Sequence, residues 1–309
     1  MKLVAWGLTD VGRKRDHNED ALLIDPALGI FAVADGMGGH IGGERASRLA
    51  IEVLQRDLAG AELSRAKQGG PSANDPACQA LEQAARGAGA AIYEAAVTEP
   101  ALAGMGTTLT ALFVRDARAY LAHVGDSRIY VIRGQYVHQL SDDHCVANEL
   151  VKRGKLTAEE LESPQYQEIA TAVTRAVGIY ENVEVDTLDF DVLPGDQFLL
   201  CSDGLHQYLD SAEHKINELL VKIADVKAST KAFIDLANAN GGSATATFYV
   251  SNIEESVESR FRDQPQRIDQ IPIGIGGRLS TIAETDRYDF VSPLSGCVML
   301  QLQARQLGS

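Results

Sequence analysis

Acidic residues recur where predicted strands of this chain end. They are Asn18-Glu19-Asp20 after the first strand and its turn, Asp35 after Phe31–Ala34, Asp126 after Tyr120–Val124, and Asp203 after Gln197–Cys201. Carboxylates at strand ends project from a rigid frame and can converge on one cleft. Hard divalent cations such as Mg²⁺ or Mn²⁺ prefer carboxylate, carbonyl and water oxygens as ligands. The pattern therefore indicates a divalent-metal site.

Glycine follows two of these aspartates, at Gly36 and Gly204. A residue without a Cβ lets its own carbonyl oxygen come close to a bound cation. An Asp-Gly pair is also an ordinary tight-turn sequence, so any one pair taken alone favours a turn. Spacing by itself supports the metal site and a set of structural turns about equally.

Short stretches rich in alternating or β-branched apolar residues predict the strands that would carry these acids. The predicted strands are Leu3–Leu8, Ile30–Ala34, Leu109–Val114, Tyr120–Val124, Ile129–Ile132, Val183–Val192, Gln197–Cys201 and Thr245–Val250. Short polar turns at Arg115–Arg118 and Arg133–Gln135 follow two of them, which favours antiparallel hairpins over parallel crossovers.

Four longer segments have helical spacing of apolar residues or a high alanine content. They are Gly43–Leu58, Pro76–Ala96, Asp210–Lys222 and Ala228–Ala239. Thr157-Ala158-Glu159-Glu160 is a capping box that predicts one more short helix, and Ala59–Asp75 is a predicted exposed loop. Long helices set apart from a run of antiparallel strands predict an α+β layered fold. The residue composition of the chain changes after Ser251, so we place a domain boundary near Asn252.

The composition is that of a globular protein with an acidic surface. The 309 residues are 45% hydrophobic and 23% charged, and the formal net charge is −15. Such a surface repels phosphate backbones and anionic lipid, which argues against nucleic-acid or bilayer binding. No apolar run approaches the roughly 20 residues of a membrane span, and the first residues lack the apolar region of a secretory signal. We therefore expect a cytoplasmic protein. The four cysteines form no CxxC pair, which argues against a disulfide framework or zinc site.

An ordered series of motifs runs through the first four fifths of the chain. The motifs are Thr9–Asp20, Val33–His40, Gly43–Ser47, Gly104–Thr108, Val124–Arg128, Leu140–His144, Thr174–Gly178 and Leu200–Leu205. Their order and spacing resemble the bacterial members of the metal-dependent protein phosphatases, the protein phosphatase 2C family, over residues 1–251. The resemblance implies a four-layer αββα sandwich, in which two stacked antiparallel sheets are flanked by helices.

The resemblance also implies a dinuclear Mg²⁺ or Mn²⁺ centre at one end of the sandwich. Asp35 would bridge the two ions, with Glu19 and the Gly36 carbonyl on one ion and Asp203 on the other. Two cations that share a water lower its pKa and hold a hydroxide in line with phosphorus, so no Cys or Ser nucleophile is expected. Asp126 would hold a third, weaker ion; the alternative is an ion pair between Asp126 and Arg128.

Three further residues have roles implied by the family. Asp20 would orient the metal-bound water, and Arg15 would hold the substrate phosphate with its guanidinium fork. From the sequence alone, simple solvent exposure beside Lys14 is the alternative for Arg15. His40 would contact substrate and protonate the leaving oxygen, with a loop or capping role as the alternative.

Two segments limit what the resemblance implies about substrates. Residues 145–172 occupy the place of the family's mobile flap, and they carry Ser163-Pro164 where the family commonly has His-Pro. Substrate preference is therefore not transferred. Residues 252–309 are expected to be an extension that packs on the domain or docks a partner. Residues 267–283 faintly resemble the start of a cyclic-nucleotide-binding module. The remaining residues are too few to complete one.

One position departs from the family pattern. The family usually closes its catalytic domain with Gly-Gly-x-Asp-Asn-x-Thr, and Ala244 stands here where that Asp is expected. Alanine cannot bind a cation, so the metal beside Asp203 should be held more weakly; a deliberate replacement that traps substrate would produce the same residue. We expect an active protein serine/threonine phosphatase, with phosphorylated proteins as substrates and a cognate Ser/Thr kinase as partner. The alternative is a degenerate phosphatase-like regulatory module that binds a phosphoprotein or kinase without efficient turnover.

Overall fold

The computed structural model describes residues 2–13, 15–61, 75–157, 160, 163, 166, 172–209, 216, 218–219, 223, 225–242 and 245–253. The side chains at positions 2, 40 and 245–253 are not part of that description. Most of the predicted helix at 210–222, position 244 and residues 254–309 of the predicted extension lie outside the described residues.

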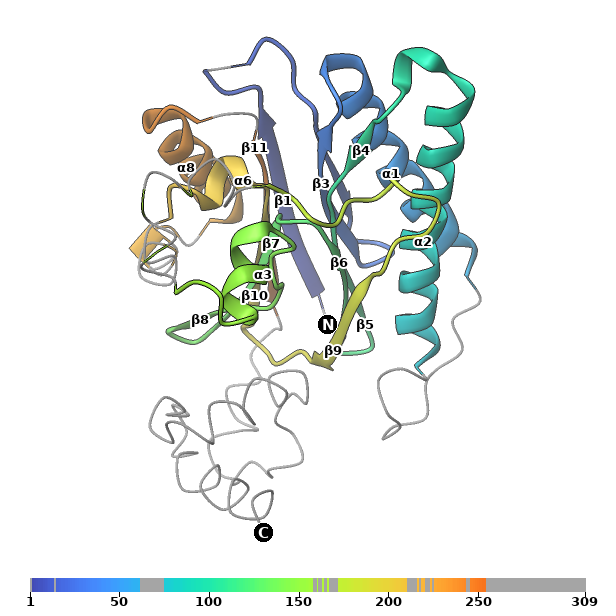
Figure 1. The fold of residues 1–309 in the computed structure, drawn as a ribbon. Helices are drawn as coiled ribbons and strands as arrows, with labels where there is room; N and C mark the ends of the chain where they lie inside the picture. Colours follow the sequence, from blue (N-terminus) through green and yellow to red (C-terminus); the bar gives the residue numbers. More distant parts are fainter. Residues whose placement is uncertain are drawn as a thin grey trace, which may run out of the picture.

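Two antiparallel sheets form the centre of the molecule (Figure 1). One has the strand order β1-β11-β10-β7-β8 and the other β2-β3-β5-β6-β9, with β4 paired to β3. The strands are β1 (Lys2–Asp10), β2 (Asp20–Asp25), β3 (Ile30–Met37), β4 (Gly106–Thr107), β5 (Leu109–Arg115), β6 (Arg118–Val124), β7 (Arg128–Arg133), β8 (Tyr136–Gln139), β9 (Asp186–Asp191), β10 (Gln197–Cys201) and β11 (Thr245–Ile253).

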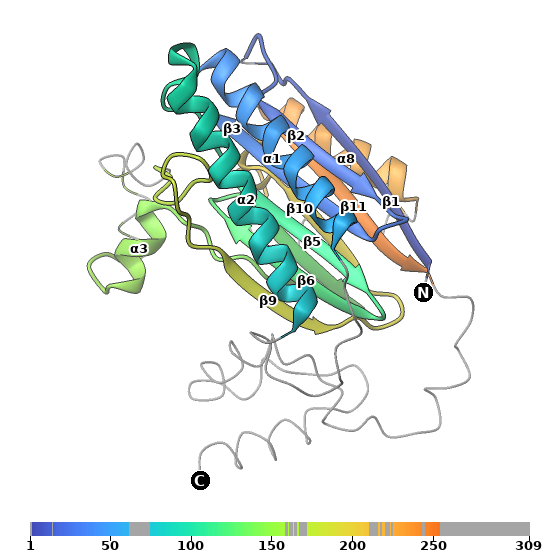
Figure 2. The ribbon, with the colours of Figure 1, turned by 90° about the vertical axis from the view of Figure 1, so that its right-hand side faces the viewer.

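Helices cover the outer faces of both sheets. Figure 1 shows α1 (His40–Gly60) and α2 (Pro76–Thr98) on one side, and α6 (Asp203–His206) and α8 (Val226–Ala239) on the other. The short helix α3 (Val146–Lys152) stands to one side of these layers (Figure 2). The 3₁₀ turn η2 (Pro100–Leu102) follows α2. The four-layer αββα sandwich implied by the resemblance is thus confirmed.

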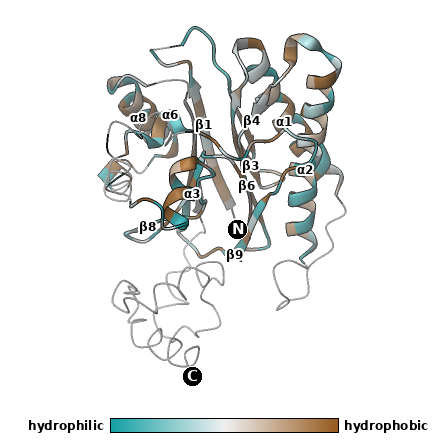
Figure 3. Ribbon diagram, viewed as in Figure 1, coloured by the Kyte–Doolittle hydropathy of each residue, from teal (hydrophilic) through white to brown (hydrophobic). Residues whose placement is uncertain are grey.

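The alternation of side chains along the strands explains the layers. Phe31 and Val33 of β3 belong to the apolar cluster between the two sheets, whereas Ile30 and Ala32 belong to the cluster beneath α1 and α2. Successive residues of a strand point to opposite faces, so a strand buried on both faces is apolar at nearly every position. A third cluster joins the first sheet to α6 and α8. The helices carry both hydrophobic and hydrophilic residues (Figure 3), as helices that cover one face of a sheet do.

Side-chain caps fix where two of the covering helices begin. The Asp75 carboxylate accepts a hydrogen bond from the Ala77 amide at 2.8 Å, and Pro76 occupies the first helical position of α2. Asp225 accepts from the Ala228 amide at 2.7 Å at the start of α8. Each cap satisfies an amide that has no partner within its helix.

Most predicted elements are confirmed, with different ends. The hairpin turns at 115–118 and 133–135 are present, and the capping box forms reciprocally, with the Thr157 amide 2.7 Å from Glu160 Oε2 and the Glu160 amide 3.2 Å from Thr157 Oγ1. The predicted strand 183–192 is wrong at both ends, since β9 covers only Asp186–Asp191. Strands β2, β4 and β8 and helices α3 and α6 were not predicted. β11 runs to Ile253, just past the boundary placed near Asn252.

Two composition-based expectations concerned membrane spans and cysteines. No helix among the described residues is both long enough and apolar enough to cross a bilayer. Cys78 and Cys201 are buried free thiols, and Cys145 is a partly buried one.

Candidate metal centre

Asp20 and Asp35 face each other across two neighbouring strands. They are directly paired in the register of β2 and β3, so Asp20 begins a strand rather than following one as predicted. Asp20 is 7% exposed. Ser202 Oγ donates to its Oδ2 at 3.0 Å, whereas its buried Oδ1 has no hydrogen-bond partner among the described residues.

Two more carboxylates complete a cluster around Asp35. Asp203 is the first residue of α6, just beyond β10, and Asp126 lies in the turn between β6 and β7. Burial, together with the charges of Asp20, Asp203 and Asp126, raises the pKa of Asp35 well above its usual value. Burial and Asp203 raise the pKa of Asp20 to about 6. Burial, Asp203 and Asp143 raise the pKa of Asp126 to about 7. Burial is the largest cause of each shift, and the charges of neighbouring aspartates add to it.

The backbone around Asp35 is fixed by the hydroxyl groups of Thr107, the last residue of β4, and of Thr108, which follows it. The Asp35 amide donates to Thr108 Oγ1 at 2.9 Å, and that hydroxyl lies 2.8 Å from Ser127 Oγ. Thr107 Oγ1 donates to the Asp35 carbonyl at 3.0 Å. Because Ser127 follows Asp126, one hydroxyl pair links the peptides of the two aspartates.

Gly36 occupies a position where only glycine fits. Its amide donates to the Glu19 carbonyl at 3.1 Å. A Cβ at Gly36 would lie 2.1 Å from the Gly43 carbonyl oxygen and 2.7 Å from the Glu19 carbonyl oxygen. Glu19 is thereby held beside Gly36, and its side chain is 14% exposed.

Arg15 lies at the edge of the carboxylate cluster. Its Nη1 is 3.5 Å from Glu19 Oε2, and its side chain is 40% exposed. Its charge is among the influences that lower the pKa of Asp20. Arg15 is therefore partly solvated and also directed toward the acids. His40 is the first residue of α1 after Gly39 at the N-cap, so its backbone is helical rather than in a loop; its side chain lies outside the described part.

The alternative ion pair predicted for Asp126 is not formed. Arg128 instead pairs with Asp143, with Nη2 2.6 Å from Oδ2 and Nε 3.0 Å from both carboxylate oxygens. The carbonyl of Asp126 accepts a hydrogen bond from His206 Nε2 at 3.0 Å. Burial, followed by the charge of Arg128, lowers the pKa of His206 to about 3, so the ring is neutral at pH 7. His206 could not be predicted from the sequence, because it follows the last family motif, Leu200–Leu205.

The donor set fits hard divalent cations. All the grouped side chains offer oxygen, and Oδ1 of Asp20 and Oδ1 of Asp203 are buried without a hydrogen-bond partner in the described structure. A divalent cation would offset the like charges that raise the carboxylate pKa values. Within the described ranges, no three His, Cys, Asp or Glu side chains form a group placed to hold a metal ion.

The chain around position 244 is tied to the edge of the site. The Gly242 carbonyl accepts a hydrogen bond from the Arg13 amide at 3.0 Å, two residues before Arg15. Thr245 pairs with Asp10 at the start of β11. Ala244 itself lies outside the described residues, so the weakened metal site predicted from it stays a prediction.

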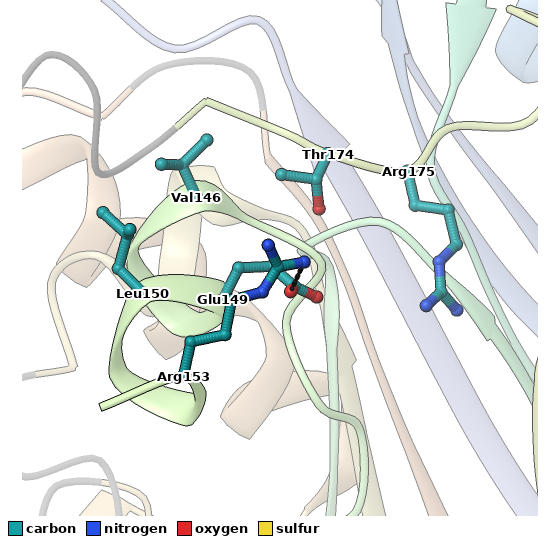
Figure 4. A pocket seen from close by; sticks show the side chains of 6 residues that line it. All are labelled: Val146, Glu149, Leu150, Arg153, Thr174 and Arg175. Carbon is teal, nitrogen blue, oxygen red and sulfur yellow. Dashed lines mark hydrogen bonds and ion pairs between the residues drawn. The ribbon is translucent and has the colours of Figure 1, made fainter. Parts of the chain in front are cut away.

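The predicted flap begins and ends on a short ladder beside the site. Cys145 pairs with Val173, the Thr174 amide donates to the His144 carbonyl at 2.8 Å, and the Val146 amide donates to Ala172 at 2.9 Å. A cavity of about 390 Å³ lies at this base, where Glu149 of α3 pairs with Arg153 just after that helix and Arg175 lies across from them (Figure 4). Its lining residues are Val146, Glu149, Leu150, Arg153, Thr174 and Arg175.

Similar proteins share this arrangement of strands and motifs. A family model described as Protein phosphatase 2C matches residues 12–244. Protein phosphatase PhpP of Streptococcus pneumoniae is 34% identical over 255 residues, which cover 81% of this chain and 98% of that protein. Serine/threonine protein phosphatase PstP of Mycobacterium tuberculosis is 36% identical over 246 residues, which cover 79% of this chain and 44% of PstP.

Solved structures show the same likeness in three dimensions. The crystal structure of the M. tuberculosis phosphatase PstP has a TM-score of 0.69 at 34% identity, and the match covers 82% of this chain and all of that one. The catalytic domain of PstP, solved in complex with two manganese ions, has a TM-score of 0.68 at 32% identity, with 82% and 99% of the two chains covered. With its fold, its motifs and these relatives in agreement, the chain belongs to the protein phosphatase 2C family.

Proposed function

We propose that this protein hydrolyses phosphoserine and phosphothreonine in proteins, with two Mg²⁺ or Mn²⁺ ions bound at the carboxylate cluster. The observation that carries the proposal is the convergence of Asp20, Asp35, Asp126 and Asp203, whose pKa values are raised or whose buried oxygens lack partners. The manganese-bound structure of PstP supports the choice of ions. We take residues 1–251 as the catalytic domain, residues 145–172 as its flap and residues 252–309 as an extension.

The proposed metal ligands are Glu19, Asp35, the Gly36 carbonyl and Asp203, with Asp126 as a ligand for a weaker third ion. Asp35 would hold both ions, because the charges of Asp20, Asp203 and Asp126 all act on it. When bound, the ions supply Lewis-acid activation of water and offset the charge of the transferring phosphoryl group. The hydroxyl pair between Thr108 and Ser127 keeps Asp35 in place while the charges around it change.

Other side chains are proposed to act on the substrate. Arg15 binds the phosphate, since its guanidinium carries a fork of donors and stands partly exposed at the edge of the cluster. Asp20 holds the attacking water in position through its unpartnered Oδ1. His40, at the start of α1, contacts the substrate near the leaving oxygen.

A phosphatase of this specificity needs a kinase that supplies its substrates. We therefore propose a Ser/Thr protein kinase as the functional partner, with both proteins in the cytoplasm. The acidic net charge of −15 fits a protein that meets other soluble proteins rather than nucleic acid or anionic lipid.

Hydrolysis of a phosphothreonine peptide with and without Mn²⁺ tests the proposed function. We expect turnover that depends on the metal and is lost with EDTA, and much slower turnover of a matched phosphotyrosine peptide. An Asp35→Asn variant is the control for contaminating phosphatase. Binding of the phosphopeptide without turnover at saturating Mn²⁺ would instead identify the protein as a regulatory module.

A further inference from the structure

His144 links the base of the flap to the turn that carries Asp126. It is 3% exposed. Its backbone amide donates to the Gly125 carbonyl at 2.7 Å, and the Gly125 amide donates to His144 Nδ1 at 3.0 Å. Both polar groups of the Gly125 peptide position are thus held by one histidine.

These contacts determine which nitrogen of the His144 ring carries the proton. Nδ1 accepts from an amide, so it carries none. Nε2 lies 3.1 Å from Asp186 Oδ2 and must donate to that carboxylate. Burial, with smaller contributions from Arg175 and Lys152, lowers the pKa of His144 and outweighs the opposing effect of Asp186, so the ring is neutral at pH 7.

The Nε2 side of the His144 ring is held by the ion pair between Asp186 and Arg175 at the base of the flap. Arg175 Nη1 lies 2.6 Å from Asp186 Oδ1, and Arg175 also lines the cavity beside α3. Asp186 therefore receives one donor from Arg175 and one from His144. The ring of His123 packs against the ring of His144, with the two ring centroids 4.8 Å apart.

The Gly125 peptide has little freedom to compensate if this contact is lost. Gly125 has φ +110°, and a Cβ there would lie 2.6 Å from Thr108 Cγ2. The next residue, Asp126, is held at its carbonyl by His206. The position of the Asp126 carboxylate thus depends on two backbone anchors, one at the Gly125 amide and one at its own carbonyl.

We propose that His144 is a positioning residue for metal binding at Asp126, because its unprotonated Nδ1 holds the Gly125 amide while Asp186 and Arg175 hold its ring. The inference rests on the proposed function, which assigns a metal ion to Asp126. It implies that changes at Arg175, in the flap cavity, are transmitted through Asp186 and His144 to the metal centre.

Two near-isosteric variants separate the two halves of the His144 contact. In His144→Asn, Oδ1 replaces Nδ1 as acceptor for the Gly125 amide, and the donor to Asp186 is lost. In His144→Gln, the side-chain amide replaces Nε2–H toward Asp186, and the buried Gly125 amide loses its acceptor. Calorimetric titration with Mn²⁺ gives the affinity of each ion, and an Asp126→Asn variant identifies the phase that depends on Asp126. We expect that phase to weaken by roughly tenfold in His144→Gln and by less than about threefold in His144→Asn, as expected for an unsatisfied buried donor.

The melting temperatures of the metal-free variants and the ¹⁵N chemical shifts of the wild-type histidine ring provide independent measurements. The ¹⁵N chemical shifts of His144 should show Nδ1 without a proton and Nε2 with one, even if neither variant folds. A proton on Nδ1, or an equal loss of Mn²⁺ affinity in the two variants, overturns the inference. If wild-type protein binds Mn²⁺ but hydrolyses no phosphopeptide, the proposed function fails while the calorimetric ranking of the variants still decides the role of His144.

Discussion

Replacing Asp20 with Asn should stabilise the metal-free protein at neutral pH. Burial and the charge of Asp203 raise the pKa of Asp20 from 3.8 to about 6 in the folded state. Below pH 3.8 the carboxyl is protonated in both states and has no effect. As the pH rises toward 6 the unfolded chain ionises Asp20 freely, whereas the folded chain resists ionisation. The ionisable group therefore destabilises the fold progressively between about pH 4 and pH 6.

The raised pKa sets the size of this effect. The difference between 3.8 and about 6 corresponds to about 3 kcal/mol in the free energy of unfolding at pH 7. Asn keeps an oxygen to accept from Ser202 Oγ, and its amide can donate toward Asp35. For a domain of this size, about 3 kcal/mol corresponds to a rise in melting temperature of roughly 6–12 °C.

The assay compares melting temperatures of wild type and Asp20→Asn in EDTA from pH 4 to pH 7.5. Only the difference between the two proteins is informative, because burial lowers the pKa of His123 to about 4 and that of His206 to about 3. Those histidines make both proteins more stable as the pH rises to about 6.5, and their contribution cancels in the difference between the two proteins. A difference that stays constant with pH, or a variant less stable than wild type at pH 7, would refute the reasoning. With saturating Mn²⁺ the order should reverse.

Four further outcomes are expected. Asp35→Asn should abolish Mn²⁺-dependent hydrolysis without unfolding the protein, and residual turnover above a few per cent would exclude a bridging role; circular dichroism checks the fold. Arg15→Ala should raise the KM for a phosphopeptide by roughly tenfold to a hundredfold through loss of charge-assisted hydrogen bonds, and unchanged kinetics would place Arg15 outside the site. Ala244→Asp should increase Mn²⁺ affinity and lower the melting temperature of the metal-free protein by repulsion with Asp203; equal metal titrations would show that position 244 does not face the metal. Mn²⁺ binding near pH 7 should release protons, because the pKa of Asp126 is raised to about 7; calorimetric enthalpies that do not vary with the ionisation enthalpy of the buffer would contradict this.

Three of the predicted strands are covered on both faces. β3, β5 and β10 are apolar at almost every position because they lie between a neighbouring sheet and a helix layer, and such runs are visible in sequence. The edge strands of the two sheets are β1, β8, β2 and β9, and polar residues are tolerated at an edge; of these four, β2 and β8 were not predicted. Their short sequences, DALLID and YVHQ, therefore carry a weak strand signal. Only pairing with β3 and β7 defines them.

The candidate site divides in a similar way. The acids could be predicted because Asp-Gly sequences after strands and the family motifs mark them. Thr108, Ser127 and His144 stand in the family motifs and His206 does not, but the contacts of all four residues could not be predicted because their partners are distant in sequence. Thr108 is 73 positions from Asp35, and its hydroxyl accepts a hydrogen bond from the Asp35 amide. Contacts of that kind depend on sheet register, which the sequence does not display locally.

The same supporting contacts explain why the carboxylates stay together without a cation. Like charges would normally separate, but the Asp35 peptide is held by the Thr108 hydroxyl and the Asp126 peptide by His206. The repulsion is therefore expressed in protonation, as raised pKa values, rather than in movement of the chain. The apolar clusters on both sides of the sheets contribute the stability that offsets this unfavourable group. A site arranged in this way needs little reorganisation when ions bind, because the backbone that carries its ligands is already in place.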